Sequence, residues 1–444
     1  MRLPAKPPDS MKVIQEASPE EISALMQSEE YLKLAHLCEV EYWPWDKFRF
    51  KARHQTKLAW ALVANGRLPR YRHLPLDGHG KANLKYTLPD AVQKELMLID
   101  QELAGRVLSD DHQPLIASQR EQFIVASLRE EAISSSLLEG AVTTRQEAER
   151  MLKSGRKPRS NGEQMVMNNY RAIMFIREHY QQELTPEFLI EVQRILTEGT
   201  LEKEDQVGRL RTAEDNIRIV DERDQEIVHQ PPPAEELEQR IAVLCRFANR
   251  RPEEEPFIHP VISACVLHFQ VGFDHPFCDG NGRTARALFY WLMLRRGYWL
   301  FEYLPISRLI YRSPGQYARA FLYSEIEDFD LTYFLLYKMR IISRARRDLH
   351  AYLREKYSQM TQARRMFSSD RRLNHRQRSV VLQATNHPDR VFTIADHQSK
   401  FAVSYGTARN DLLALSRWGY LEMSVVGKTF EFVPGDRLTE LNGE

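Results

Sequence analysis

The chain has little cysteine and almost no net charge. Lysine and arginine number 62, and aspartate and glutamate 61, among 444 residues that include four cysteines. Because the cysteines are widely separated, they provide neither a disulfide framework nor the ligand spacing of a zinc site. The balanced charge excludes wholesale binding of nucleic acid or another polyanion, so any such contact has to be local.

Long apolar runs, repeats and low-complexity tracts are missing as well. No uninterrupted apolar run reaches the roughly 20 residues of a membrane span. The N-terminus, MRLPAKPPDS, lacks the apolar centre of a signal peptide. We therefore expect a cytoplasmic protein with no membrane partner. The hydrophobic fraction of 43% is that of a globular protein, and the length suffices for two or three domains.

A charged and flexible stretch lies between two strongly apolar segments of the chain. HPFCDGNGRTAR, residues 275–286, follows PVISACVLHFQVGF and precedes ALFYWLMLRRG, and both flanks are long and apolar enough for buried helices. Polar and charged groups inside a core cost free energy unless they find partners. The stretch is therefore expected to form either a satisfied polar network or a functional site.

The second half of this stretch suits a polyphosphate. Gly280, Asn281 and Gly282 allow consecutive backbone N–H groups to turn inward and surround an anion. The helix that begins near Gly282 directs its positive N-terminus to the same place. Arg283 and Arg286 lie three residues apart, on adjacent turns, so both guanidinium groups can reach one polyphosphate.

The first half supplies a metal ligand and a base. Asp279 is a hard oxygen ligand one residue before the anion-binding turn, placed to hold a Mg²⁺ that bridges phosphate oxygens. His275 is the residue here that readily takes a proton near neutral pH. Cys278 is expected to pack against the loop, since no second histidine nearby would activate it as a nucleophile. These residue types together indicate group transfer from a nucleoside triphosphate to a hydroxyl.

HPFCDGNGRTAR resembles the H-P-F-x-D/E-G-N-G-R-x-x-R signature of Fic domain proteins, with every fixed position occupied. HPVISACVLHF upstream, and GQYARAF and DLT downstream, are similar to the family too, so the resemblance covers roughly residues 110 to 345. It implies a mainly α fold, a Fic-type helical core with a β-hairpin flap. It also implies transfer of AMP from Mg-ATP to a Ser, Thr or Tyr hydroxyl of a target protein or of the chain itself, with release of pyrophosphate.

The resemblance assigns a role to each residue of the signature. His275 would take the hydroxyl proton, and Asp279 would bind Mg²⁺. Asn281 and the loop amides would hold the α-phosphate, Arg283 the β-phosphate region and Arg286 the γ-phosphate. Two alternatives stay open. In the first, the core transfers another phosphate-containing group or removes AMP; in the second, the chain is a DNA-binding regulator whose core senses the nucleotide.

A second motif, SSLLEG, lies well upstream. Ser135 and Glu139 are four residues apart and share one helical face, and Gly140 can end the helix in a left-handed conformation. The motif resembles the inhibitory S/T-x-x-x-E-G/N motif of the family, which implies that Glu139 pairs with Arg286 and takes the γ-phosphate position. The alternative is an ordinary helix end.

Two short β-branched runs between these motifs predict a β-hairpin. The runs lie around Ile217 to Val220 and Ile227 to Val228, and the acidic turn DERDQ separates them; Ile219, Val220, Ile227 and Val228 are the candidate docking residues. In the family a hairpin at this place, the flap, pairs with the backbone of the target protein. An ordinary edge hairpin is the alternative.

The C-terminal segment predicts a small α+β domain. VSYGTARNDLLALSRWGYL resembles the second helix of winged helix-turn-helix domains, followed by two strands around Val425 to Lys428. The resemblance places Tyr405, Thr407 and Arg409 on the face available to a DNA major groove and Lys428 in the wing. Winged helices also dock proteins, so DNA and a protein both stay open as partners. The sequence leaves the oligomeric state open, a homodimer included.

The expected organisation has four parts, of which the first contains the aromatic cluster EYWPWDKFRF and is expected to pack as structural support. They are an N-terminal helical region over 1–109, a catalytic core over 110–345, a helical linker over 346–372 and a winged-helix domain over 373–444.

Overall fold

The computed structural model of the chain describes residues 3–78, 82–103, 117–220, 226–369, 372–386, 390–426 and 429–439. The chain divides into two compact units, Met1–Arg346 and Arg347–Glu444. This division is coarser than the four expected parts, because the N-terminal region and the core pack into one unit. The boundary expected between residues 109 and 110 lies outside the described residues.

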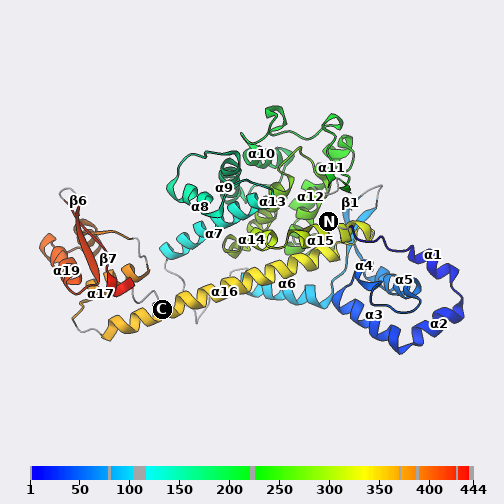
Figure 1. Ribbon diagram of the computed structural model, residues 1–444, viewed down its shortest axis with the longest axis horizontal. Helices are drawn as coiled ribbons and strands as arrows, with labels where there is room; N and C mark the ends of the chain where they lie inside the picture. Colours follow the sequence, from blue (N-terminus) through cyan, green and yellow to red (C-terminus); the bar gives the residue numbers. More distant parts are fainter. Residues whose placement is uncertain are drawn as a thin grey trace. The chain divides into compact units, whose positions relative to one another are not determined.

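The fold is mainly α-helical, as the sequence predicted (Figure 1). The N-terminal part holds α1 Ser10–Glu16, α2 Pro19–Gln27, α3 Glu29–Glu41, α4 Trp45–Phe48, α5 Thr56–Arg67, a hairpin of β1 Arg72–Asp77 and β2 Asn83–Tyr86, and α6 Asp90–Leu103. The helices that follow are α7 Ala117–Leu138, α8 Arg145–Ser154, α9 Asn161–His179, α10 Pro186–Thr197, α11 Leu237–Asn249, α12 Pro260–Asp274, α13 Asn281–Arg295, α14 Ile306–Tyr311, α15 Pro314–Ile326 and α16 Thr332–Ser369. None of the helices in the described part of the chain is both long and apolar enough to cross a membrane.

The aromatic cluster near the N-terminus is packed, as expected. Trp43, Trp45, Phe48 and Trp60 form a buried cluster with Cys38. Buried aromatic side chains of this size contribute strongly to stability, because each removes a large apolar area from water. The cluster therefore anchors α3, α4 and α5 to one another.

Polar contacts join this cluster to the start of α16. The hydroxyls of Tyr42 and Tyr71 donate to Asp330 Oδ2 at 2.6 and 2.9 Å. The buried Arg67 donates to Tyr333 Oη at 2.8 Å, and its guanidinium carbon lies 3.9 Å from the centre of the Tyr42 ring. A buried charge such as that of Arg67 is costly without partners, and its partner Tyr333 is on α16. The contacts with Asp330 and Tyr333 therefore attach the N-terminal region to the core.

Helices α12 and α13 form the centre of the unit, and the signature stretch joins them. Twelve of the fifteen residues of α12 are buried, which confirms that the flanking apolar segment is a core helix. Helix α12 begins at Pro260, whose fixed φ suits a first turn. It ends at His275, which has a left-handed backbone with φ 47°. Helix α13 follows Gly280, which has φ 82°, a conformation that glycine adopts without strain.

The predicted hairpin is present beside this centre. Strand β3, Ile219–Val220, pairs antiparallel with β4, Ile227–His229, and the register shifts between the two pairs. The acidic turn between the strands lies outside the described residues.

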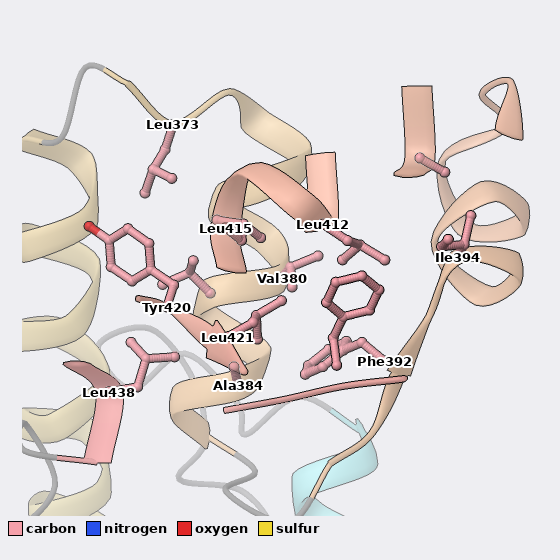
Figure 2. Packing of buried hydrophobic residues seen from close by; sticks show 13 residues of the cluster. Leu373, Val380, Ala384, Phe392, Ile394, Leu412, Leu415, Tyr420, Leu421 and Leu438 are labelled. Atoms are coloured by element: carbon pink, nitrogen blue, oxygen red, sulfur yellow. The ribbon is translucent and has the colours of Figure 1, made fainter. Parts of the chain in front are cut away.

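The second unit contains both helices and strands, and the predicted helix at VSYGTARNDLLALSRWGYL is followed by two strands. It holds α17 His375–Asn386, β5 Phe392–Thr393, α18 Ile394–Phe401, α19 Tyr405–Arg417, β6 Leu421–Val426, β7 Thr429–Pro434 and α20 Asp436–Thr439. The strands form an antiparallel sheet in the order β5-β7-β6. Figure 2 shows its apolar core, where Val380, Leu412, Leu415, Leu421 and Phe392 come together from helices and strands.

Candidate active site

The loop between α12 and α13 is held by side chains that bond to its backbone. Asn281 Oδ1 accepts from Phe277 N at 3.0 Å, and Asn281 Nδ2 donates to Phe277 O at 2.8 Å. From α10, Gln193 Nε2 donates to Asp279 O at 3.2 Å, and Gln193 Oε1 accepts from Gly208 N at 2.8 Å. The side-chain amide of Asn281 is thus committed to the loop, and only backbone groups of this turn remain for an anion.

Gly280 and Gly282 leave room that a larger residue would fill. A Cβ at Gly280 would lie 2.9 Å from Thr197 Cγ2. A Cβ at Gly282 would meet the carboxylate of Glu139, with Cδ at 2.9 Å and Oε2 at 3.0 Å. Glu139 therefore lies directly against the first turn of α13. We call Gly280, Gly282, Arg283 and Arg286 the anion site below.

His275 is a half-buried, neutral base. Its Nδ1 lies 3.0 Å from Gly272 O. Because a carbonyl oxygen only accepts, Nδ1 carries the hydrogen and Nε2 keeps its lone pair. Burial lowers the pKa of His275 to about 4, from an ordinary value of 6.5. The imidazole is therefore neutral at pH 7 and able to accept a proton.

Arg211 holds the backbone of this histidine in place. Arg211 Nε donates to His275 O at 2.7 Å, and Arg211 N donates to Pro276 O at 2.9 Å. The left-handed backbone of His275 is a sparsely populated conformation for a residue with a side chain, so it requires support from its surroundings.

Arg283 and Asp279 form an ion pair at the edge of the anion site. Arg283 Nη2 donates to Asp279 Oδ2 at 2.9 Å, and Arg283 Nη1 donates to Leu196 O at 3.0 Å. The side chain of Arg283 is fully buried, whereas 49% of the Asp279 side chain is exposed. Asp279 can therefore present an oxygen to a ligand while its partner remains fixed.

Arg286 is buried and contacts the motif SSLLEG on α7. Its Nε donates to Ser135 Oγ at 2.8 Å, and its Nη2 donates to Ser135 O at 3.1 Å and to Glu139 Oε1 at 2.9 Å. The pair with Glu139 is a single contact and not a fork, because Ser135 takes the neighbouring donor. The remaining nitrogen, Nη1, is buried and has no hydrogen-bond partner among the described residues.

The charge of Glu139 is favoured at this position. Burial by itself raises the pKa of Glu139, but Arg286 and then Arg283 outweigh it and leave the pKa below the ordinary value. A carboxylate at the N-terminus of a helix, beside two guanidinium groups, occupies the kind of position that suits a phosphate. Glu139 is therefore ionised at neutral pH and fills part of the anion site.

Cys278 is half-buried at the same loop. Burial raises the pKa of its thiol to about 11, and the carboxylate of Asp215 adds to the effect. The thiolate is therefore scarce at neutral pH, which agrees with its interpretation as a packing residue.

Four residues that support the loop were not among the sequence-predicted site residues: Gln193, Thr197, Arg211 and His229. His229 Nε2 lies 2.7 Å from Phe273 O, and its Nδ1 lies 2.8 Å from Glu325. Burial lowers the pKa of His229, but Glu325 outweighs it and the pKa is raised. No short motif marks these residues, because they approach the loop from distant parts of the chain.

The hairpin presents apolar side chains to solvent. Val220 and Ile227 are exposed, whereas Ile219 and Val228 are half-buried. Ile219 pairs with His229, which bonds to the end of α12. One end of the hairpin is therefore fixed next to the signature stretch.

The residues predicted to face DNA belong to the second unit of the chain. Tyr405 is exposed at the start of α19. Thr407 is used as part of the helix cap, since its hydroxyl lies 2.9 Å from Ser404 Oγ. Arg409 lies 5.8 Å from the centre of the Phe430 ring. Lys428 lies outside the described residues.

Comparisons with known proteins match the segment that builds the site. The Fic/DOC family profile matches residues 183–293. A stretch of 70 residues is 36% identical to the protein adenylyltransferase Fic of Nematostella vectensis, and it covers 16% of each chain. A stretch of 71 residues is 39% identical to the protein of the same name from Culex quinquefasciatus, and it covers 16% of this chain and 14% of that protein. The match thus spans about a sixth of the length of these relatives.

Solved structures share the fold over a longer part of the chain. A Fic family protein from Desulfovibrio desulfuricans G20 superposes with a TM-score of 0.52 at 20% identity, over 79% of this chain and 98% of that one. Fic-1 from C. elegans superposes with a TM-score of 0.51 at 16% identity, over 79% and 92%. The chain therefore contains a Fic domain, built on the signature stretch between α12 and α13.

Proposed function

We propose that the chain is an autoinhibited protein adenylyltransferase that transfers AMP from ATP to a hydroxyl of a target protein. The observation that carries the proposal is the arrangement of a neutral His275 beside an anion site into which Glu139 projects. The names of the Nematostella and Culex relatives support the same activity.

The transfer needs one proton acceptor and a fixed polyphosphate. His275 Nε2 takes the proton of the target hydroxyl, whose oxygen forms a bond to the α-phosphorus of ATP. The bond from the α-phosphorus to the bridging oxygen breaks, and pyrophosphate leaves with the electron pair. Backbone N–H groups at Gly280 and Gly282, with Arg283 and Arg286, stabilise the charge that develops.

Asp279 fits the role of a magnesium ligand. Its half-exposed carboxylate lies at the edge of the anion site and uses one oxygen for Arg283. Mg²⁺ prefers a few carboxylate oxygens together with phosphate oxygens and water, which this single acidic side chain allows. When bound, the ion would neutralise charge on the polyphosphate. Among the described residues no group of three or more acidic, histidine or cysteine side chains forms a metal cluster, so ATP has to contribute ligands.

The hairpin is the proposed docking element for the target. Val220 and Ile227 expose apolar surface beside a short strand pair, and an extended segment can add to such an edge through backbone hydrogen bonds. Backbone pairing carries little side-chain information, so targets of different sequence fit, including a segment of the chain itself. A DNA or protein partner of the second unit remains a separate proposal, based on the exposed start of α19.

The proposal is tested with ATP labelled separately at the α- and γ-phosphate, offered to a cell lysate and to the purified protein. We expect Glu139→Gly to incorporate the α label and not the γ label. His275→Ala in that background should lose incorporation by roughly 100-fold or more, the usual contribution of a general base. Incorporation of the γ label would indicate phosphoryl transfer. Release of AMP from previously labelled protein, without incorporation, would indicate hydrolytic removal of AMP.

A further inference from the structure

Helix α7 carries a second glutamate that the signature chemistry does not use. Glu131 is 3% exposed, and its carboxylate accepts two hydrogen bonds from one residue of α14. Ser307 N donates to Glu131 Oε2 at 2.9 Å, and the hydroxyl of Ser307 donates to Oε1. Burial raises the pKa of Glu131, and the two hydrogen bonds from Ser307 oppose this rise because they stabilise the carboxylate. This pair is therefore a firm attachment between α7 and α14.

Glu131 lies on the same face of α7 as Ser135, which contacts Arg286. Glu131 and Ser135 are four residues apart and share one stripe of α7, and Glu139 lies in the turn directly after its last residue, Leu138. Eight residues span about 12 Å of helix, so the attachment lies about two turns before Glu139. A rigid helix transmits a displacement at Glu131 to the carboxylate of Glu139.

Other contacts hold this part of α7 as well: Glu130 pairs with Arg145 of α8, and Ser135 accepts hydrogen bonds from Arg286 of α13. On a neighbouring face, Asn169 Nδ2 lies 3.2 Å from Ala132 O and 3.3 Å from Ser136 Oγ. These contacts join neutral groups to α9. A cavity lined by Leu128 and Tyr290, among others, borders Glu131. Loss of the Glu131 carboxylate would enlarge this space and give α7 room to move.

We infer that Glu131 is a positioning residue, which attaches α7 to α14 through Ser307 so that Glu139 is held against Arg286. The inference rests on the proposed function, because it assigns a residue to the control of that activity. The charges of Glu131 and Arg286 interact, but the hydrogen bonds of the Glu131 carboxylate go to Ser307, and the proposed control acts through the helix. Its loss should therefore weaken inhibition without removing any group of the anion site.

The test compares Glu131→Ala, Glu131→Gln and Ser307→Ala, each with and without Glu139→Gly. Alanine removes both acceptors. Glutamine can still accept from Ser307 N and donate to Ser307 Oγ, so it should restore most of the attachment. Glu95→Ala is the matched control, because Glu95 is a buried glutamate of α6 whose partner is Arg346 of α16. Folded protein is matched by thermal unfolding before each assay.

Two readouts are taken: incorporation of labelled AMP, and Mg-ATP affinity by titration calorimetry. With Glu139 present, Glu131→Ala should raise both by about fivefold or more, the lower end of typical coupling between sites. Glu131→Gln should stay near wild type. In the Glu139→Gly background, Glu131→Ala should change neither readout by more than about twofold. Without the Glu139 carboxylate, a displacement of α7 no longer affects ATP binding, so the two substitutions do not add. Glu95→Ala should lower stability without raising either readout.

Amide hydrogen exchange gives a third readout, which Ser307→Ala makes accessible even when Glu131→Ala fails to fold. Ser307→Ala should speed exchange in the last two turns of α7 and leave α13 unchanged. The inference is overturned if Glu139→Gly activates the protein while Ser307→Ala and Glu131→Ala alter neither ATP affinity nor exchange in α7. If Glu139→Gly changes neither incorporation nor ATP affinity, the proposed function is at fault instead. In that case, faster exchange in α7 would still show that Ser307 attaches α7 through Glu131, but it would not show that this contact controls a transferase.

Discussion

The carboxylate of Glu139 lies so close to Gly282 that a methyl group on that residue would come within 2.9 Å of Glu139 Cδ. Gly282 is in the first turn of α13, where backbone N–H groups have no partners within the helix. Under the proposed function, the carboxylate thus lies where a phosphate of ATP would bind. Competition for one volume, and not a change of the catalytic groups, is the physical basis of the proposed inhibition.

Substitution at Gly282 measures this contact through stability alone. We expect Gly282→Ala to destabilise the protein by about 1 kcal/mol, because the added methyl displaces Glu139 from Arg286. In the Glu139→Gly background the methyl meets no carboxylate, so the same change should be nearly neutral. Chemical unfolding of the four variants gives the coupling. Equal destabilisation in both backgrounds would show that the methyl strains the helix and not the contact.

Glu139 and Arg286 should respond in opposite directions. Glu139→Gly removes the competing carboxylate and should raise incorporation of labelled AMP by at least about tenfold, since small displacements of a substrate cost about 100-fold in rate. Arg286→Ala also breaks the pair, but it removes a phosphate donor and should lower incorporation. An ordinary structural ion pair predicts that both changes reduce activity together. Incorporation is compared at equal concentrations of folded protein.

The pH dependence of the reaction should reflect a half-buried histidine. Because burial lowers the pKa of His275 to about 4, the rate of the Glu139→Gly variant should stay level from pH 7 to about pH 5 as far as this base is concerned. The ordinary value of 6.5 would instead give a fall below pH 6.5. A pH profile of kcat/KM for ATP distinguishes a His275 pKa of about 4 from the ordinary value of 6.5.

The same pKa has a consequence for stability with a definite sign. The unfolded chain binds a proton at His275 below pH 6.5, whereas the folded protein binds it only near pH 4. The folded protein should therefore become less stable as the pH falls from 6.5 to about 4. His268, whose pKa burial lowers well below 6.5, adds in the same direction. His275→Ala should flatten the fall in unfolding free energy between pH 6.5 and 5, and an unchanged slope would contradict the burial of this group.

Asp279 and Arg283 should separate metal dependence from nucleotide binding. Asp279→Ala in the Glu139→Gly background should raise the Mg²⁺ concentration needed for half-maximal incorporation, because the protein ligand is lost. Arg283→Ala should weaken Mg-ATP binding and leave the Mg²⁺ requirement of the remaining activity similar. The measurement is a Mg²⁺ titration at fixed ATP with both variants. Normal transfer and normal titrations in both would remove this pair from the site.

Local patterns sufficed for much of the fold. The apolar flanks of residues 275–286 predicted two buried helices, and the β-branched runs predicted the hairpin, because each signal depends on neighbours in sequence. Gln193 and Arg211 were not predicted, since their role depends on where α10 and the segment before β3 meet the loop. The two hydrogen bonds between the Asn281 side chain and the Phe277 backbone were not predicted either, because they depend on the geometry of the loop.

The partners of Arg286 bear on how such a protein could be switched on by proteolysis. Arg286 lies within residues 183–293, the part matched by the family profile, but its contacts at Ser135 and Glu139 are both supplied by α7. A cut that removed α7 would take away the competing carboxylate and, with it, the acceptors that satisfy a buried guanidinium. Removal of α7 would therefore destabilise the site around Arg286 and also remove the inhibitory carboxylate. Activation that keeps the enzyme intact has to move α7 and leave it in the chain.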